Sequence, residues 1–164
     1  MSLVHAVLER MVAFYEGDAR RIQHFMKVWG YAKWIGESEG LDAETQLTLE
    51  VAALMHDIGI RPAERKFGSD AGKLQEQEGP APAREMLEAL GVDEPRIARV
   101  CYLIAHHHTY QNVDGIDYRI LLEADFLVNL YEENASQNAI RHALQSIFRT
   151  ESGTKLCRTM FAAE

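Results

Sequence analysis

VAALMHDIGI, residues 51–60, is an apolar run that ends in a polar pair, His56-Asp57, just before Gly59. Its apolar residues belong to the core stripe of a helix predicted over residues 43–57. A buried carboxylate is costly unless a cation or an arginine lies beside it. Imidazole nitrogen and carboxylate oxygen are ligands that suit divalent transition metals. The pair therefore indicates a metal site at the end of a buried helix; the alternative is a capped and solvated helix end.

Helical periodicity extends to both sides of this run, and no Asn-Gly or Asp-Gly hairpin joins two alternating strands. The predicted helices cover residues 3–15, 19–38, 43–57, 80–90, 94–108, 117–133 and 135–149. Residues 60–79 are expected to form a long loop with at most a short helix. The tail to Glu164 is expected to be mobile or to dock late. The sequence thus predicts a single-domain, all-α bundle of about six to seven helices over residues 1–164.

The composition limits the classes of partner and compartment. The 164 residues carry a formal net charge of −8. General nucleic-acid binding needs a positive surface, which an acidic chain lacks, although a few local cations can still hold a small phosphorylated substrate. Two cysteines without metal-ligand spacing favour a reducing cytoplasm. No secretory signal is visible, and no apolar run approaches the ~20 residues that span a bilayer. We therefore expect a cytoplasmic protein without membrane contact.

Two further polar residues stand on apolar helical faces. His24 lies on a stripe with Val28 in the helix predicted over residues 19–38, and Arg21 precedes it by one turn. Asp125 lies inside ILLEADFLVNLYEE, residues 120–133, which is otherwise mostly apolar. An aspartate inside such a helix has poor helix propensity and a desolvation cost. A compensating partner is expected beside it.

The order of these residues, His24, then His56-Asp57, then Asp125, resembles the H…HD…D pattern of the HD-domain superfamily of metal-dependent phosphohydrolases. The resemblance extends to the segments RIQHFMKVWGYAKWI, LEVAALMHDIG and ILLEADFLVN. It covers roughly residues 18–135, which leaves a C-terminal helix and tail over 135–164. It implies a helical bundle that binds one divalent transition metal ion (Fe, Mn, Co, Ni or Zn) through His24, His56, Asp57 and Asp125.

Some HD proteins hold a second ion, and the same resemblance points to where it would bind. Glu78 stands where those relatives have a histidine, and a carboxylate is also a good ligand for iron or manganese. His107 continues the core stripe of the helix over 94–108, and His108 follows it. The alternatives are a charged loop for Glu78 and a helix-dipole interaction for the histidines, of which His106 is expected to lie outside the site.

Candidate catalytic residues surround these ligands. Asp57 is expected to orient the attacking water, and His107 is a candidate for substrate contact. Arg21 is a candidate for phosphate binding, since a guanidinium fork suits phosphate oxygens. Lys66 could add positive charge, and Glu64 could act as a general acid or base. The alternatives are a surface ion pair for Arg21 and a solvated loop for Lys66 and its neighbours.

The leading functional hypothesis is hydrolysis of a small phosphoester, with a nucleotide or related phosphomonoester as the expected substrate. The first alternative is a di-iron oxygenase that cleaves a C–C or C–P bond, which Glu78 and His107 keep open. The second is a non-catalytic ligand-binding module of the same fold. A homodimer is also open, because Trp34, Tyr131 and Phe148 could face either a partner or the core.

Overall fold

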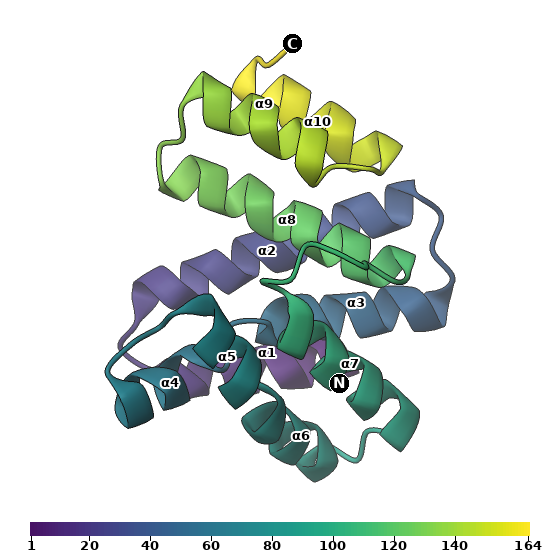
Figure 1. The fold of residues 1–164 in the computed structure, drawn as a ribbon. Coiled ribbons are helices and arrows are strands. Elements are labelled where there is room, and N and C mark those ends of the chain that lie inside the picture. Colours follow the sequence, from purple (N-terminus) through teal and green to yellow (C-terminus); the bar gives the residue numbers. More distant parts are fainter.

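The protein is an all-α bundle without strands, and the computed structural model describes residues 1–164 (Figure 1). Its helices are α1 (Leu3–Phe14), α2 (Ala19–Ser38), α3 (Ala43–Met55), α4 (Ile60–Phe67), α5 (Gly72–Glu78), α6 (Pro80–Ala89), α7 (Glu94–His106), α8 (Ile116–Glu132), α9 (Gln137–Ser146) and α10 (Glu151–Phe161). No helix has both the length and the apolar character needed to cross a membrane.

Helix α3 is the central element. Asp42 caps it, since its side chain accepts hydrogen bonds from the backbone N–H groups of Glu44 and Thr45. Every residue from Thr48 to Met55 is buried, because α1, α2, α7 and α8 all pack against this helix. Helices α9 and α10 form a further layer beyond α8, and α4 to α6 lie at the opposite end of the molecule (Figure 1). His56 and Asp57, which follow α3 directly, therefore lie in the middle of the bundle.

The predicted all-α bundle is confirmed, and the seven predicted helices are all present. The structure adds three more helices, α4 and α5 within residues 60–79 and α10 in the tail. The prediction of a long loop was wrong, although a proline such as Pro62 usually ends a helix. Pro62 lies in the first turn of α4, where a backbone N–H has no helical partner to lose.

The C-terminal helix is fixed by one buried carboxylate. Glu123 of α8 is fully buried and accepts hydrogen bonds from the backbone N–H groups of Arg149 and Thr150, at 2.6 and 2.9 Å. The Thr150 hydroxyl also donates to Glu123 at 2.5 Å and accepts from the N–H of Gly153. Because these bonds join α8 to the start of α10, the tail is a docked helix rather than a mobile segment.

Two glycines bring the start of α4 against the junction of α5 and α6. A Cβ atom at Gly59 would lie 2.3 Å from the carbonyl oxygen of Gln75 and 2.8 Å from the nitrogen of Gly79. A Cβ at Gly79 would lie 2.5 Å from the side chain of Ile104. Only glycine permits such close backbone approach. The α4–α5 pair is thereby held next to the His56-Asp57 turn.

Helix α1 also contacts this turn. The buried Tyr15 hydroxyl donates a hydrogen bond of 2.6 Å to the backbone carbonyl of Asp57. We predict that Tyr15→Phe lowers the free energy of unfolding by about 0.5–1.5 kcal/mol, because the carbonyl loses one hydrogen bond and keeps the one from the backbone N–H of Ile60. Urea denaturation measures the change. Tyr131→Phe, at an exposed tyrosine, is the control and should change stability little; equal effects would contradict the prediction.

Candidate metal centre

Four side chains predicted as ligands meet at one point, although they come from α2, from the end of α3 and from α8. The Nε2 atoms of His24 and His56 lie 3.3 Å apart. Asp57 Oδ2 lies 3.2 Å from Nε2 of His24 and 3.4 Å from Nε2 of His56. Asp125 Oδ1 lies at the same two distances from these nitrogens. His24, His56 and Asp57 therefore form a set that could hold one ion, and Asp125 Oδ1 lies beside both imidazoles of this set. These four residues are called the first group of donors.

The rings of three histidines are oriented by hydrogen bonds at Nδ1. His56 Nδ1 lies 2.7 Å from the carbonyl oxygen of Ala53, and His107 Nδ1 lies 2.7 Å from that of Ile104. His24 Nδ1 lies 2.9 Å from the Glu132 carboxylate. Since these partners accept, Nδ1 carries a proton, and each Nε2 is directed toward the carboxylates, where a metal ion can take the place of a second proton. This is the arrangement by which outer partners orient metal-bound histidines.

The electrostatics of this cluster favour a cation. Burial alone would raise the pKa of Asp57 and Asp125, but the neighbouring histidines hold both pKa values below the usual range. Burial would likewise lower the pKa of His24, but the adjacent carboxylates of Asp125 and Asp57 raise it to about 11. Asp125 Oδ1 and His107 Nε2 are buried and have no hydrogen-bond partner. Lone pairs that face one another in this way fit a divalent cation between them.

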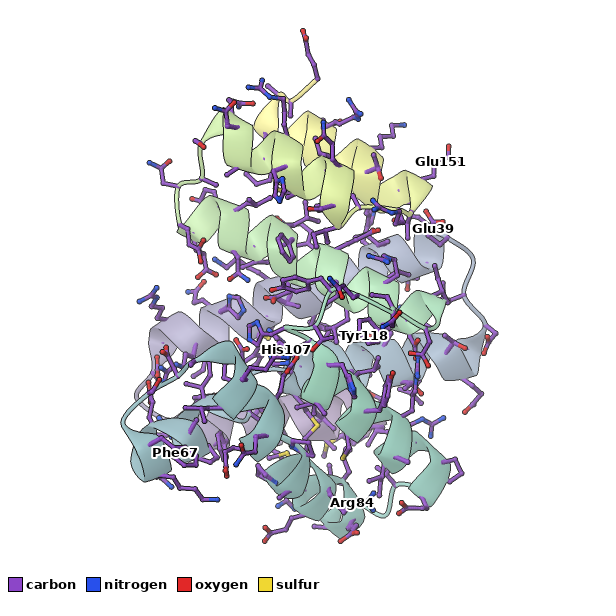
Figure 2. All side chains as sticks on the ribbon, in the orientation of Figure 1. Glu39, Phe67, Arg84, His107, Tyr118 and Glu151 are labelled. Atoms are coloured by element: carbon purple, nitrogen blue, oxygen red, sulfur yellow. The ribbon has the colours of Figure 1, made fainter.

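Asp57 also faces a second group of donors. Its other oxygen, Oδ1, lies 3.3 Å from Nε2 of His107. Asp57, His107 and His108 form a second set that could hold an ion. Figure 2 labels His107 where α7 ends, among the side chains at the middle of the molecule. Asp57 is therefore placed to serve two neighbouring sites.

Glu78 is the predicted ligand that the structure does not bring into either group of donors. It is buried at the end of α5, and its Oε2 lies 2.5 Å from the Lys66 ammonium. Lys66 is engaged by this ion pair and does not line the cleft described below. The predicted roles of Glu78 as a ligand and Lys66 as a phosphate contact therefore have no support from their positions.

A cleft of about 480 Å³ opens above the first group of donors. His24, Asp57 and Asp125 line its floor, and Arg20 and Arg21 from the first turn of α2 line a wall. Arg21 binds the Glu64 carboxylate through two nitrogens, at 2.7 and 3.2 Å, and lies 3.3 Å from Asp18. The positions of Arg21 and Glu64 thus support the ion-pair alternative.

Arg20 is one of the cleft residues that the sequence did not predict. It lines the cleft and is exposed, and it forms no ion pair. In the sequence, only its position next to Arg21 points to Arg20, and that position gives no reason to choose Arg20 over Arg21. His107 is almost completely buried and does not line the cleft, so it is not placed to contact substrate. His106 lies outside both donor groups, as expected, and stacks on Tyr102 at 4.1 Å between ring centroids.

A substitution at Glu132 tests whether the groups bonded to Nδ1 of the histidines contribute to metal binding. Its carboxylate accepts from His24 Nδ1 and lies 3.2 Å from the Lys27 ammonium. We predict that Glu132→Ala weakens metal binding by about 10–100-fold, because the His24 ring loses its orientation. Titration of the metal-free protein with Mn²⁺ or Zn²⁺ in a calorimeter measures this. Glu132→Gln keeps an accepting oxygen and should restore most of the affinity; equal losses in both variants would contradict the role.

Comparisons with known proteins agree with this geometry. The HD domain model matches residues 21–144, which include all four donors of the first group. The fold is similar to the crystal structure of a predicted HD superfamily hydrolase from an uncultured Thermotogales bacterium, with a TM-score of 0.69 and 24% sequence identity over 96% of this chain and 84% of that chain. No curated protein matches the sequence significantly. Since the matched model spans most of its length, the chain belongs to the HD domain family.

Proposed function

We propose that the protein is a metal-dependent hydrolase of small phosphoesters. One observation carries the proposal: His24 and His56, each held at Nδ1, direct Nε2 toward the carboxylates of Asp57 and Asp125 beneath an open cleft. Burying these four polar side chains is less favourable than burying apolar ones, so packing of the core alone does not explain their presence. The similarity to a predicted HD superfamily hydrolase supports hydrolysis as the reaction type.

His24, His56, Asp57 and Asp125 would hold the ion. When bound, a divalent cation polarises a phosphoryl oxygen and lowers the pKa of a nearby water molecule. Nitrogen and oxygen donors in equal number suit Fe, Mn, Co, Ni or Zn better than Mg or Ca, which prefer oxygen alone. The metal requirement of activity should therefore follow this group of ions.

The other roles fall to the residues of the cleft. Arg20 has no competing partner, so its guanidinium is available to bind phosphate oxygens. Arg21, held by Glu64 and Asp18, forms the wall beside it. Asp57 lies at the cleft floor with an ionised carboxylate, which can accept a hydrogen bond from the attacking water and so orient it.

The test is release of inorganic phosphate from a panel of phosphomonoesters, nucleotides included, by protein stripped with chelator and resupplied with Mn²⁺, Co²⁺ or Ni²⁺. Turnover that depends on the added ion supports the proposal. Retained metal without turnover of any phosphoester would instead support a non-catalytic ligand-binding module.

The di-iron oxygenase remains a second candidate because Asp57, His107 and His108 form a second donor group. It requires two iron ions per chain and consumption of dioxygen with an organic substrate. Elemental analysis and an oxygen electrode test both requirements. A protein that binds one ion per chain would eliminate this candidate.

A further inference from the structure

The walls of the cleft differ from those of a site that binds a flat aromatic group. Ile60 is the one hydrophobic residue among the 13 that line it, and no Phe, Tyr or Trp is present. Nucleobases are commonly bound by stacking on aromatic or apolar side chains. The volume of about 480 Å³ would admit a mononucleotide, so the chemistry of the walls, rather than their size, disfavours one.

One polar face of α8 leads from the metal donors along the cleft. Asp125, Asn129, Glu132 and Glu133 line it at positions i, i+4, i+7 and i+8, which share a helical face. Asp125 connects this face to the metal centre, since it is 4% exposed and its Oδ1 lies 3.2 Å from Nε2 of His24. A substrate whose phosphate lies at the metal centre would therefore extend along this acidic face.

The charges of the cleft can be divided into paired and unpaired ones. Arg21 is balanced by Asp18 and Glu64, and Glu132 by Lys27. Three charged lining residues form no ion pair: Arg20 on α2, Asp70 between α4 and α5, and Glu133 at the end of α8. Asn129 also lacks a side-chain hydrogen bond. One free cation is thus accompanied by two free carboxylates and a free amide.

We propose that this cleft selects phosphoesters whose remaining part is small, aliphatic and rich in hydrogen-bond donors, either hydroxyl or ammonium groups. The inference rests on the proposed phosphoester hydrolysis. Arg20 is available for the phosphate, while Asp70, Asn129 and Glu133 supply acceptors for the donors of the substrate. An acceptor left without a partner costs binding energy, so a phosphoester that lacks donors is bound less well.

The experiment compares kcat/KM for four phosphomonoesters with the metal-loaded protein: propyl phosphate, glycerol 1-phosphate, 2-aminoethyl phosphate and AMP. We expect glycerol 1-phosphate, 2-aminoethyl phosphate or both to exceed propyl phosphate and AMP by about tenfold or more. The better of the two identifies hydroxyl or ammonium as the recognised donor. If AMP or propyl phosphate is the best substrate, the inference is overturned while the proposed hydrolysis stands. If none of the four releases phosphate, the proposed function itself is in question.

A double variant separates recognition from general electrostatics. Asp70→Ala with Glu133→Ala removes two acceptors and two negative charges, and the loss of charge by itself should favour every phosphate anion. We expect it to lower kcat/KM for the preferred donor-bearing substrate by about tenfold, yet leave propyl phosphate unchanged or improved. Glu85→Ala, at an exposed charge on α6 outside the cleft, is the matched control and should change neither. Equal changes for both substrates in the double variant would contradict the inference.

Discussion

Replacing His56 by alanine is expected to remove metal binding and phosphoester hydrolysis together. His56 is fully buried, and its Nε2 lies within 3.4 Å of the donor atoms of His24, Asp57 and Asp125, so alanine removes one of the two nitrogen donors of the group. Loss of an outer partner of a metal ligand costs about 10–100-fold, and loss of a ligand itself should cost more than about 100-fold in kcat/KM. Elemental analysis and phosphate release measure the two effects.

His142→Ala is the matched control for this variant. His142 lies on α9, is exposed, and belongs to neither donor group. Its replacement should leave both the metal content and the rate unchanged. Circular dichroism establishes that the His56 variant still folds. A folded His56→Ala protein that kept its metal and its rate would show that the proposed centre is not the reactive one.

Metal removal is expected to lower the melting temperature by about 8–16 °C. Binding of an ion at a concentration about a thousandfold above its Kd stabilises a native protein by about 4 kcal/mol. Each kcal/mol corresponds to about 2–4 °C for a domain of this size. The structural reason is that without a cation the buried donors of His24, His56, Asp57 and Asp125 face one another.

Calorimetric melts of stripped and reloaded protein test this expectation. Zn²⁺ or Mn²⁺ should restore the melting temperature, whereas Ca²⁺, which prefers six to eight oxygen ligands, should restore little of it. The His56→Ala protein should show almost no response to any ion. If reloading shifts this variant as far as the unaltered chain, the stabilising ion binds elsewhere.

Much of the fold and the first donor group could be predicted from the sequence because the signals are local. Helical periodicity and the Asp42 cap mark the ends of α3, and Asp125 is conspicuous in an apolar helix. The positions of His24, His56, Asp57 and Asp125 relative to one another then follow from the family pattern. Residues 60–79 contain Pro62 and several glycines among many charges, a composition typical of loops, so α4 and α5 were missed.

The remaining features depend on contacts between distant residues. Nothing local shows that Lys66 would bind Glu78, or that Glu64 would reach across 43 positions to Arg21. Glu132 lies seven residues after Asp125 and so shares its face of α8, but its hydrogen bond to His24 spans 108 positions. Ion pairs between separate helices are set by how the helices pack, and single-sequence patterns do not encode that packing.

The hydrogen bond from Tyr15 to the backbone of Asp57 has a consequence for how the centre can diverge between relatives. Tyr15 lies outside the matched segment of residues 21–144, yet its hydroxyl fixes the carbonyl of a donor residue. The residues that determine the shape of the metal centre therefore extend beyond the segment that the family model matches. Changes in the first fifteen residues can shift the Asp57 backbone, and with it the angles at which both carboxylate oxygens are presented, while every ligand stays the same.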